Sequence, residues 1–548
     1  MAHALAGKPV REQDIIDVQT IVDAYFDNVP DVTNPTQLVS FGTSGHRGTS
    51  VDGTFTDLHV AAITQAICDS RKQFGATGPI FVGQDTHALS QPALVTVLEV
   101  LAGNGVTAMV DCDMDFVPTP SVSRAIIRYN EEHDDKADGI IITPSHNPPD
   151  NGGIKYNTII GGPADTVVTK WIEMRANEYL TAYCESEDFK RISIDNIEPT
   201  AQVPYDYKGL YVEELGDVIN MEAIKAAGPK VLVDTLGGSG ASYWNAIKER
   251  YGLDLTIIHD DYDPTFSFMT YDHDGKVRMD CSSTYVMASV INRIGDFDLA
   301  VGNDPDYDRY GIVVSSGLIS ANTFLTLAAR YLFTTRGWKN KGVGKTVVCT
   351  TMIDKWAADA EIPVFEVPVG FKYFSQLLFD GAIGIGGEES AGASFLKKDG
   401  TVWTTDKDGM IMALLSMEIM AVMGKSALKM ADESLEEFGN PSFGRIDAPC
   451  KKEQKQILKQ MSAELITATT VDGDPITNIR TTSLYNDMPI DGVRVETDKG
   501  WFVARPSGTE DLYKIYGESY KGDLGLVALL TAGEEIVNAA LNGTIETE

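Results

Sequence analysis

Three carboxylates at alternate positions follow an apolar segment near the middle of the chain. The sequence N-D-P-D-Y-D-R at 303–309 places Asp304, Asp306 and Asp308 directly after the strand-like segment 299–302. In a tight turn this spacing can direct three oxygens at one hard cation such as Mg²⁺. An EF-hand is excluded because the positions of its required glycine and glutamate hold other residues. An acidic turn without metal explains the loop equally well in isolation, and its position after a strand favours the metal site.

A second loop carries a hydroxyl group between two prolines. The sequence T-P-S-H-N-P at 143–148 contains Ser145 beside His146, and Lys155 follows shortly downstream. A serine can carry a phosphoryl group covalently if a cation neutralises that group and a base manages the proton of the acceptor. Serine and asparagine beside proline are also common turn residues. On its own, this loop is therefore better interpreted as a turn.

Two loops in the second half of the chain offer groups that suit a phosphorylated sugar. The sequence G-G-E-E-S-A-G at 386–392 presents Glu388 and Ser390, which can bind vicinal hydroxyls. The sequence R-P-S-G-T-E at 505–510 combines the bidentate donor Arg505 with hydroxyls and a glycine, a favourable cradle for phosphate. Its spacing differs from that of a P-loop, which argues against ATP binding. A surface turn is the competing interpretation of each loop.

Three further basic residues lie in turn-like sequence. Arg47 belongs to F-G-T-S-G-H-R-G at 41–48, Lys372 follows V-G-F, and Lys407 lies in D-K-D-G. Contact with an anion and a tight turn are equally good interpretations of the Arg47 loop, whereas a solvated lysine is the usual finding at the other two positions. Their importance depends on the other loops.

Short apolar segments bounded by glycine, aspartate or proline alternate with helical patterns. We expect strands at 80–83, 106–110, 139–143, 231–234, 255–258, 299–302 and 346–350, and helices at 59–74 and 92–102. This alternation predicts mixed or parallel sheets covered by helices. Strand-like segments lead directly into the loops at 144, 303 and 386. Because such sheets bind ligands beyond the carboxyl ends of their strands, three α/β units could each present one loop.

Polar, turn-rich segments divide the 548 residues into four expected domains. They are 1–205 with an N-terminal arm and the serine loop, 206–320 with the acidic loop, 321–438 with the loop at 386–392, and 439–548 with the Arg505 loop. The last is predicted to be a small α+β domain with helices at 452–464 and 526–541 and strands at 493–496 and 501–504. We expect a linker at 194–208 and an acidic helix at 12–26, to which no chemistry is assigned.

The composition excludes several kinds of partner. A formal net charge of -34 repels nucleic acid and anionic membranes, so an anionic substrate requires a local cluster of basic residues. The six cysteines lack zinc-type spacing and the chain does not begin with an apolar signal peptide, which favours a reducing, cytoplasmic location. The apolar run at 410–423 is too short to cross a bilayer and predicts a buried helix.

Taken in order, the five loops resemble the signature loops of the α-D-phosphohexomutase superfamily, and most closely its bacterial phosphoglucomutase branch. The resemblance extends from residue 41 to 516. It implies three related α/β domains and a smaller fourth domain around a central cleft. The chain has T-P-S where T-A-S is commoner in the superfamily, and it has Pro305 and Tyr307 where its relatives frequently have glycines. The reacting groups are retained, so these differences concern loop geometry.

The resemblance also implies a role for each loop residue. Ser145 would be the phosphoserine and would hold Mg²⁺ together with Asp304, Asp306 and Asp308. Arg47 and Arg309 would assist transfer electrostatically, Lys155 would act as a general acid or base, and His146 would lie close to the transfer point. The implied substrate-binding residues are Thr43, Ser44, Lys372, Glu388, Ser390, Lys407, Arg505, Ser507, Gly508 and Thr509.

A phosphoglucomutase of this kind interconverts glucose 1-phosphate and glucose 6-phosphate through phospho-Ser145 and a glucose 1,6-bisphosphate intermediate, and we expect a monomer or homodimer. A phosphomannomutase or phosphoglucosamine mutase is the main alternative, although G-E-E-S resembles glucose-specific members. A metal-dependent phosphatase usually needs two metals and several histidine ligands, and the eight histidines here are scattered. A non-catalytic sugar-phosphate sensor is disfavoured because the reacting groups are all present.

Overall fold

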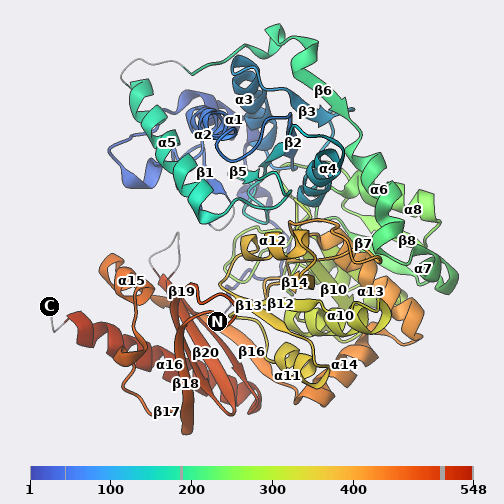
Figure 1. Cartoon of the computed structure of the whole chain (residues 1–548), viewed down its shortest axis with the longest axis vertical. Coiled ribbons are helices and arrows are strands. Elements are labelled where there is room, and N and C mark those ends of the chain that lie inside the picture. The colour runs from blue at the N-terminus through green and yellow to red at the C-terminus, as the bar shows by residue number, and fades with distance from the viewer. Residues whose placement is uncertain (1, 43–44, 185–188, 507–511, 546–548) are drawn as a thin grey trace. The chain divides into compact units, whose positions relative to one another are not determined.

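The computed structural model describes residues 2–42, 45–184, 189–506 and 512–545. The chain forms two compact units, each of which is described by itself. The first comprises Met1–Ala321, Phe374–Gly381 and Ser390–Leu428, and the second comprises Asn322–Tyr373, Ala382–Glu389 and Lys429–Glu548. Figure 1 shows the strands and helices of both units.

The first sheet lies in the first unit and has the strand order β1-β5-β4-β2-β3-β6. Its strands are β1 (His46–Thr49), β2 (Ile80–Gln84), β3 (Ala108–Asp111), β4 (Asp138–Ile142), β5 (Asn151–Asn157) and β6 (Gln202–Tyr205). β2, β3, β4 and β6 pair in parallel, whereas β5 runs antiparallel to both β1 and β4. The associated helices are α1 (Val18–Asp27), α2 (Asp57–Ser70), α3 (Ser90–Gly103), α4 (Thr119–Glu132) and α5 (Thr166–Cys184).

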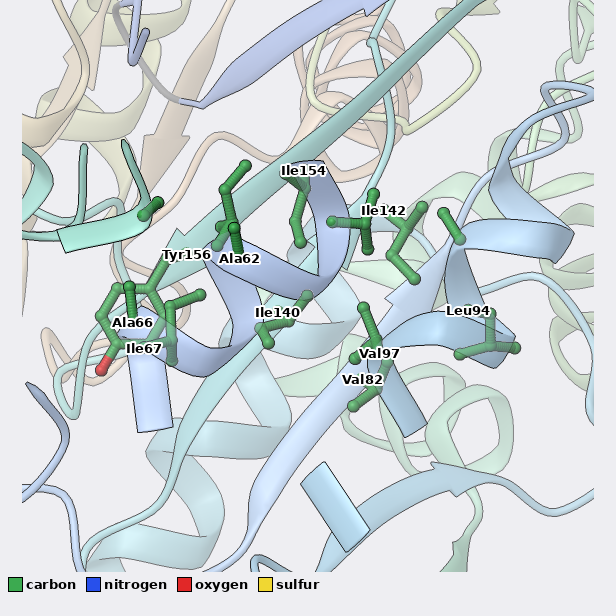
Figure 2. Close-up of a cluster of buried hydrophobic side chains, with 14 of the residues drawn as sticks. Ala62, Ala66, Ile67, Val82, Leu94, Val97, Ile140, Ile142, Ile154 and Tyr156 are labelled. Carbon is green, nitrogen blue, oxygen red and sulfur yellow. The ribbon is translucent and has the colours of Figure 1, made fainter. Parts of the chain in front are cut away.

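Helices cover both faces of this sheet because its central strands are apolar on both sides. Successive strand residues point to opposite faces. Val82, Ile140 and Ile142 pack with residues of α2, α3 and α5 in one buried cluster, part of which is shown in Figure 2. Phe81 and Ile141 belong to a separate cluster with α4. The continuous apolar segments expected at 80–83 and 139–143 are therefore confirmed as the centre of a mixed sheet.

The second sheet also lies in the first unit, in the order β11-β10-β9-β7-β8. Its strands are β7 (Val231–Asp234), β8 (Leu255–Ile258), β9 (Leu299–Asn303), β10 (Tyr310–Val314) and β11 (Gly317–Leu318). Its helices are α6 (Tyr207–Val218), α7 (Met221–Ala227), α8 (Ala241–Tyr251) and α9 (Ala288–Ile291). α13 (Gly409–Met423), buried as expected, packs on β9 and β10. β9 and the antiparallel β10 flank the acidic loop, so a rigid hairpin presents its carboxylates.

In the second unit, β12 (Gly342–Thr346) pairs in parallel with both β13 (Val364–Val367) and β14 (Ile383–Gly387). The helices with residues in this unit are α10 (Ala321–Thr335), α11 (Met352–Asp359), α12 (Lys372–Phe379) and α14 (Ala427–Phe438). Most of α12 belongs to the first unit, as does β15 (Ala393–Phe395), which follows β14 along the chain. The loop that contains Glu388 therefore begins at the carboxyl end of a parallel strand, as the sequence predicted.

The C-terminal sheet of the second unit is antiparallel, in the order β16-β21-β20-β19-β18-β17. Its strands are β16 (Ser442–Pro449), β17 (Thr470–Val471), β18 (Asp474–Thr482), β19 (Pro489–Thr497), β20 (Gly500–Pro506) and β21 (Leu512–Ser519), and its helices are α15 (Lys452–Lys459) and α16 (Gly522–Ile545). By length and composition, Gly522–Asn542 of α16 could span a membrane, and α13 with α14 would also qualify if counted together despite an 87° bend. α16 packs along β16, β20 and β21, so we interpret it as the covering helix of this sheet (Figure 1).

Several expected elements differ from the structure. The strand expected at 346–350 ends at Thr346, because the next residues turn and bury Val347 and Val348 against Trp501 of the C-terminal sheet. The helix expected at 12–26 starts only at Val18, where the Asp17 side chain caps it. The helix expected at 452–464 ends at Lys459.

The segment expected to be a linker, 194–208, contributes one strand to the first sheet. Its residues Gln202–Tyr205 form the edge strand β6, which pairs in parallel with β3. The strand β16, next to the expected boundary at 439, was not predicted either. Both are edge strands with alternating or partial exposure, and an edge strand lacks the continuous apolar pattern that marks a buried strand.

Candidate active site

Ser145 lies on the loop that follows β4, and its side chain is buried. Its φ of +61° is in the left-handed region, which residues other than glycine rarely adopt. The amide donates to Thr143 Oγ1 at 2.7 Å, and the hydroxyl donates to Asp304 Oδ2 at 2.9 Å. Such backbone conformations concentrate at functional sites. The bend directs the hydroxyl of the serine loop at the acidic loop, 159 residues further along the chain.

The three aspartates of the acidic loop form a buried cluster. One carboxylate oxygen of each residue lies within 4.8 Å of the others. Burial and then the neighbouring carboxylates raise the pKa of Asp304 well above its usual range. Asp306 Oδ1 and Asp308 Oδ1 are buried and accept no hydrogen bond from any described residue. Buried oxygens without a donor are costly, and hard oxygen ligands suit Mg²⁺, so this cluster fits a divalent cation.

Two lysines also contact the acidic cluster. Lys155, on β5, places Nζ 2.6 Å from Asp306 Oδ2 and 3.0 Å from Asp308 Oδ2. Lys407 Nζ lies 3.0 Å from the same oxygen of Asp308. Burial lowers the pKa of Lys155, but the two carboxylates outweigh this effect and raise the pKa overall. Lys155 is therefore an ammonium ion paired with two carboxylates of the cluster.

Arg309, His146 and Asp280 form a second polar group beside the serine. His146 Nδ1 lies 3.3 Å from Ser145 Oγ, and His146 Nε2 lies 4.0 Å from Asp280 Oδ2. Arg309 Nη1 donates to that Asp280 oxygen at 3.4 Å. Burial and then the charge of Arg309 hold the pKa of His146 well below its usual value. His146 is thus a neutral imidazole, which can share a hydrogen bond with the serine hydroxyl.

Arg47 lies on β1, where it pairs with Gly153 of β5. Its guanidinium forms no hydrogen bond or ion pair with the residues that the structure describes, although Asp306 is near enough to act on it electrostatically. Burial lowers the pKa of Arg47 from its usual value. An arginine in this position can accept an anionic group without first breaking an ion pair.

Hydrogen bonds from distant segments hold the acidic loop in place. Thr119 at the start of α4 donates its hydroxyl to Asp306 Oδ2 at 2.6 Å. The amide of Gly409 at the start of α13 donates to the Tyr307 carbonyl at 2.9 Å. A Cβ atom on Gly409 would lie 2.0 Å from the Arg309 carbonyl oxygen, so only glycine permits this approach. Thr119 and Asp280 escaped the sequence analysis because neither lies in a recognisable motif.

The remaining predicted residues are not all described in one unit. Ser390 belongs to the first unit and is half-buried. In the second unit, Glu388 lies just after β14, Lys372 lies at the start of α12, and Arg505 on β20 donates from Nε to the Ile490 carbonyl at 2.8 Å. Thr43, Ser44, Ser507, Gly508 and Thr509 lie outside the described residues. The structure therefore brings Ser145, Lys155 and Lys407 together with the three aspartates. It describes the other residues expected to bind sugar and phosphate separately.

Comparison with known proteins identifies the family. Four models of the phosphoglucomutase/phosphomannomutase family match in order: α/β/α domains I, II and III at 38–182, 210–317 and 320–438, and the C-terminal domain at 447–524. A phosphoglucomutase from Komagataeibacter xylinus is 46% identical over 539 residues, which cover 97% of each chain. The chain belongs to the phosphoglucomutase/phosphomannomutase family.

More distant members of the family share the whole architecture. Phosphoglucomutase 1 from Saccharomyces cerevisiae is 26% identical, with 90% of each chain covered. Among solved structures, a putative phosphomannomutase from Thermus thermophilus superposes with a TM-score of 0.71 at 23% identity, covering 91% of this chain and 99% of the other. The parafusin phosphoglucomutase from Paramecium gives the same TM-score at 20% identity, covering 94% and 96%. The predicted fold class, three α/β domains and a smaller C-terminal domain, is confirmed.

Proposed function

We propose that this enzyme is a phosphoglucomutase that interconverts glucose 1-phosphate and glucose 6-phosphate through a phosphorylated Ser145. The observation that carries the proposal is the hydroxyl of Ser145, which lies 2.9 Å from Asp304 Oδ2 within the three-carboxylate cluster. A serine beside a cation site can accept and return a phosphoryl group. The 46% identity to a phosphoglucomutase supports glucose phosphates as the substrates.

Asp304, Asp306 and Asp308 would hold Mg²⁺, together with an oxygen of the phosphate on Ser145. When bound, the ion neutralises charge on the transferred group. Asp306 Oδ1 and Asp308 Oδ1 support this assignment, because they accept no hydrogen bond from the described residues and a cation would satisfy both.

The chain's own residues would position the substrate and manage its protons. The P–O bond to Ser145 Oγ breaks as a P–O bond to the free sugar hydroxyl forms, and the return transfer from glucose 1,6-bisphosphate restores the phosphoserine. Lys155 would be the proton donor to the departing oxygen, because the raised pKa keeps its ammonium group protonated. Arg47 and Arg309 would neutralise the transferring group, while His146 would hydrogen-bond Ser145 Oγ.

The other loops would bind the sugar and the phosphate that does not react. Glu388 and Ser390 would accept hydrogen bonds from sugar hydroxyls, assisted by Lys372 and Lys407. Arg505 would bind the second phosphate through its guanidinium. We propose the same clamp role for Ser507, Gly508 and Thr509, and substrate contact for Thr43 and Ser44. The domain divisions at 205, 320 and 438 would give each domain one of these loops.

We further propose a cytoplasmic enzyme, monomeric or homodimeric, that binds neither nucleic acid nor membrane. Free thiols on Cys68, Cys112, Cys281 and Cys349 support a reducing compartment. The net charge of -34 supports the exclusion of polyanionic partners.

Removal of divalent metal should abolish activity and lower stability together. Dialysis against EDTA is expected to reduce the mutase rate by at least about 10²-fold, and added Mg²⁺ should restore it. Mg²⁺ at about 100 times its dissociation constant should stabilise the protein by about 2.7 kcal/mol, measured as a shift in thermal unfolding. Full activity in protein shown by elemental analysis to lack metal would contradict the assignment.

Substrate preference tests the proposal against its alternatives. With a trace of the corresponding bisphosphate, we expect kcat/KM for glucose 1-phosphate to exceed that for mannose 1-phosphate and glucosamine 1-phosphate by at least about 10-fold. Equal rates with mannose or glucosamine phosphates would indicate a phosphomannomutase or phosphoglucosamine mutase instead. Release of inorganic phosphate at the rate of isomerisation would indicate a metal-dependent phosphatase.

A further inference from the structure

An aspartate and a histidine contact the serine loop without taking part in the proposed mechanism. They belong to the sequence D-T-H at 85–87, directly after β2. The exposed fraction of Asp85 is 0% and that of His87 is 1%. Charged groups at such depth need partners, so their hydrogen bonds show what they do.

Asp85 accepts four hydrogen bonds. Its Oδ1 receives the His87 amide at 3.0 Å and the Ser90 hydroxyl at 2.6 Å. Its Oδ2 lies 2.8 Å from His87 Nδ1 and receives the Thr143 hydroxyl at 2.6 Å. Burial alone would raise the pKa of Asp85, but His87 and the two hydroxyls outweigh it and lower the pKa. Asp85 is therefore a carboxylate whose lone pairs are all used.

His87 faces only acceptors. Its Nδ1 faces the Asp85 carboxylate, and its Nε2 lies 3.0 Å from the backbone carbonyl oxygen of Asn147. Neither partner can donate a proton, so both ring nitrogens must carry one, which makes the ring an imidazolium. Among its other neighbours, Phe266 is uncharged and its ring lies 5.1 Å away. Asp306 raises the pKa of His87 from a greater distance, as Asp85 does.

These two side chains form hydrogen bonds with the serine loop on both sides of Ser145. On one side, Asp85 binds the hydroxyl of Thr143, which in turn accepts the amide of Ser145 at 2.7 Å. On the other side, His87 binds the carbonyl of Asn147. The residue between them has the left-handed φ of +61°. The ion pair therefore opposes relaxation of this strained residue.

We propose that Asp85 and His87 form a buried ion pair that positions Ser145 for phosphoryl transfer. The inference rests on the proposed role of Ser145 as the phosphoryl carrier. Neither residue touches the reacting atoms, so both are positioning residues. Their contribution should appear in the chemical step, because displacement of a reacting group by about 1 Å can cost about 10²-fold in rate. Sugar binding should be little affected, since neither side chain lies on a sugar-binding loop.

The test compares His87→Phe with a matched buried histidine, His59→Phe. His59 is also buried in the first domain, but it faces the Thr56 hydroxyl and the Gln37 carbonyl, and burial lowers its pKa to about 3. We expect His87→Phe to lower kcat by about 10²-fold with KM for glucose 1-phosphate within about threefold of wild type. His59→Phe should keep the wild-type kcat. An equal loss of kcat in both variants, or a loss confined to KM, would overturn the inference.

A spectroscopic measurement covers the case in which His87→Phe does not fold. In protein with ¹⁵N-labelled histidine, one ring should keep both nitrogens protonated at about pH 8, well above the usual histidine pKa of about 6.5. Asp85→Asn should remove that signal by depriving His87 of its counter-ion. Absence of any imidazolium signal in the wild type would refute the ion pair.

The outcome can be separated from that of the proposed function. If glucose 1,6-bisphosphate phosphorylates Ser145 in the wild type while His87→Phe keeps full kcat, only the positioning role fails. If the wild-type serine accepts no phosphate, the proposed function fails, and the imidazolium signal still reports whether the ion pair exists.

Discussion

Replacement of Ser145 with alanine is expected to lower the mutase kcat by about 10⁴-fold or more. The variant loses the only group that the proposed cycle uses to carry the phosphoryl group, and loss of a covalent carrier removes the route itself rather than one stabilising contact. The acidic cluster and Lys155 remain, so sugar phosphate and metal should still bind. The rate is measured with glucose 1-phosphate and a trace of glucose 1,6-bisphosphate.

Intact mass provides the direct readout for Ser145→Ala. After incubation with glucose 1,6-bisphosphate, the wild type should gain one phosphoryl group and the variant none. Ser70→Ala is a suitable control, because Ser70 is likewise buried but donates its hydroxyl within α2, to Ile67. Retention of activity by Ser145→Ala would point to a different carrier, and retention of biological function without activity would support a sugar-phosphate sensor.

Replacement of Lys155 with methionine should have the second largest effect. It should lower kcat and raise the affinity for Mg²⁺. The variant keeps the apolar stem but loses the ammonium that lies 2.6 Å from Asp306 and 3.0 Å from Asp308. Loss of a general acid typically costs about 10²- to 10⁴-fold in kcat. Affinity for Mg²⁺ should rise, because the positive charge that competes for these carboxylates is gone.

The two readouts for Lys155→Met are steady-state kinetics and calorimetric titration with Mg²⁺. Without metal, the variant should also unfold at a lower temperature, since two buried carboxylates lose a counter-ion. Lys170→Met is a matched control, because Lys170 pairs with Glu173 on the exposed surface of α5, where ion pairs contribute little. Weaker Mg²⁺ binding together with unchanged kcat would show that Lys155 serves only to hold the loop.

The central strands and the loops that follow them could be predicted from the sequence. A strand buried on both faces must be apolar throughout, so β2, β4, β7 and β9 appear as continuous apolar segments that end in polar loops. The acidic loop is a local pattern, and its three aspartates do form a cluster. The edge strands β6 and β16 were not predicted, because partial exposure leaves no clear apolar pattern.

The long-range partners of the site could not be predicted from the sequence. Asp280, Thr119 and Asp85 each contribute through one hydrogen bond or more to a residue distant in the chain. A lone aspartate or threonine carries no periodicity or spacing that reveals its partner. The protonation states also depend on the folded structure: burial lowers the pKa of both His146 and His87, but Arg309 lowers that of His146 further, whereas Asp85 raises that of His87.

The acidic loop is held by contacts with residues that are far away in the chain. These contacts affect the order in which the protein folds. Asp306 is separated by 187 residues from Thr119 and by 151 from Lys155. Contacts between residues so far apart in the sequence form slowly, because the long intervening segment must first be brought into a closed loop. The proposed metal site should therefore be among the last features to form during folding, and no single domain released by proteolysis should retain it. Acquisition of Mg²⁺ affinity during refolding would then report completion of the whole first unit.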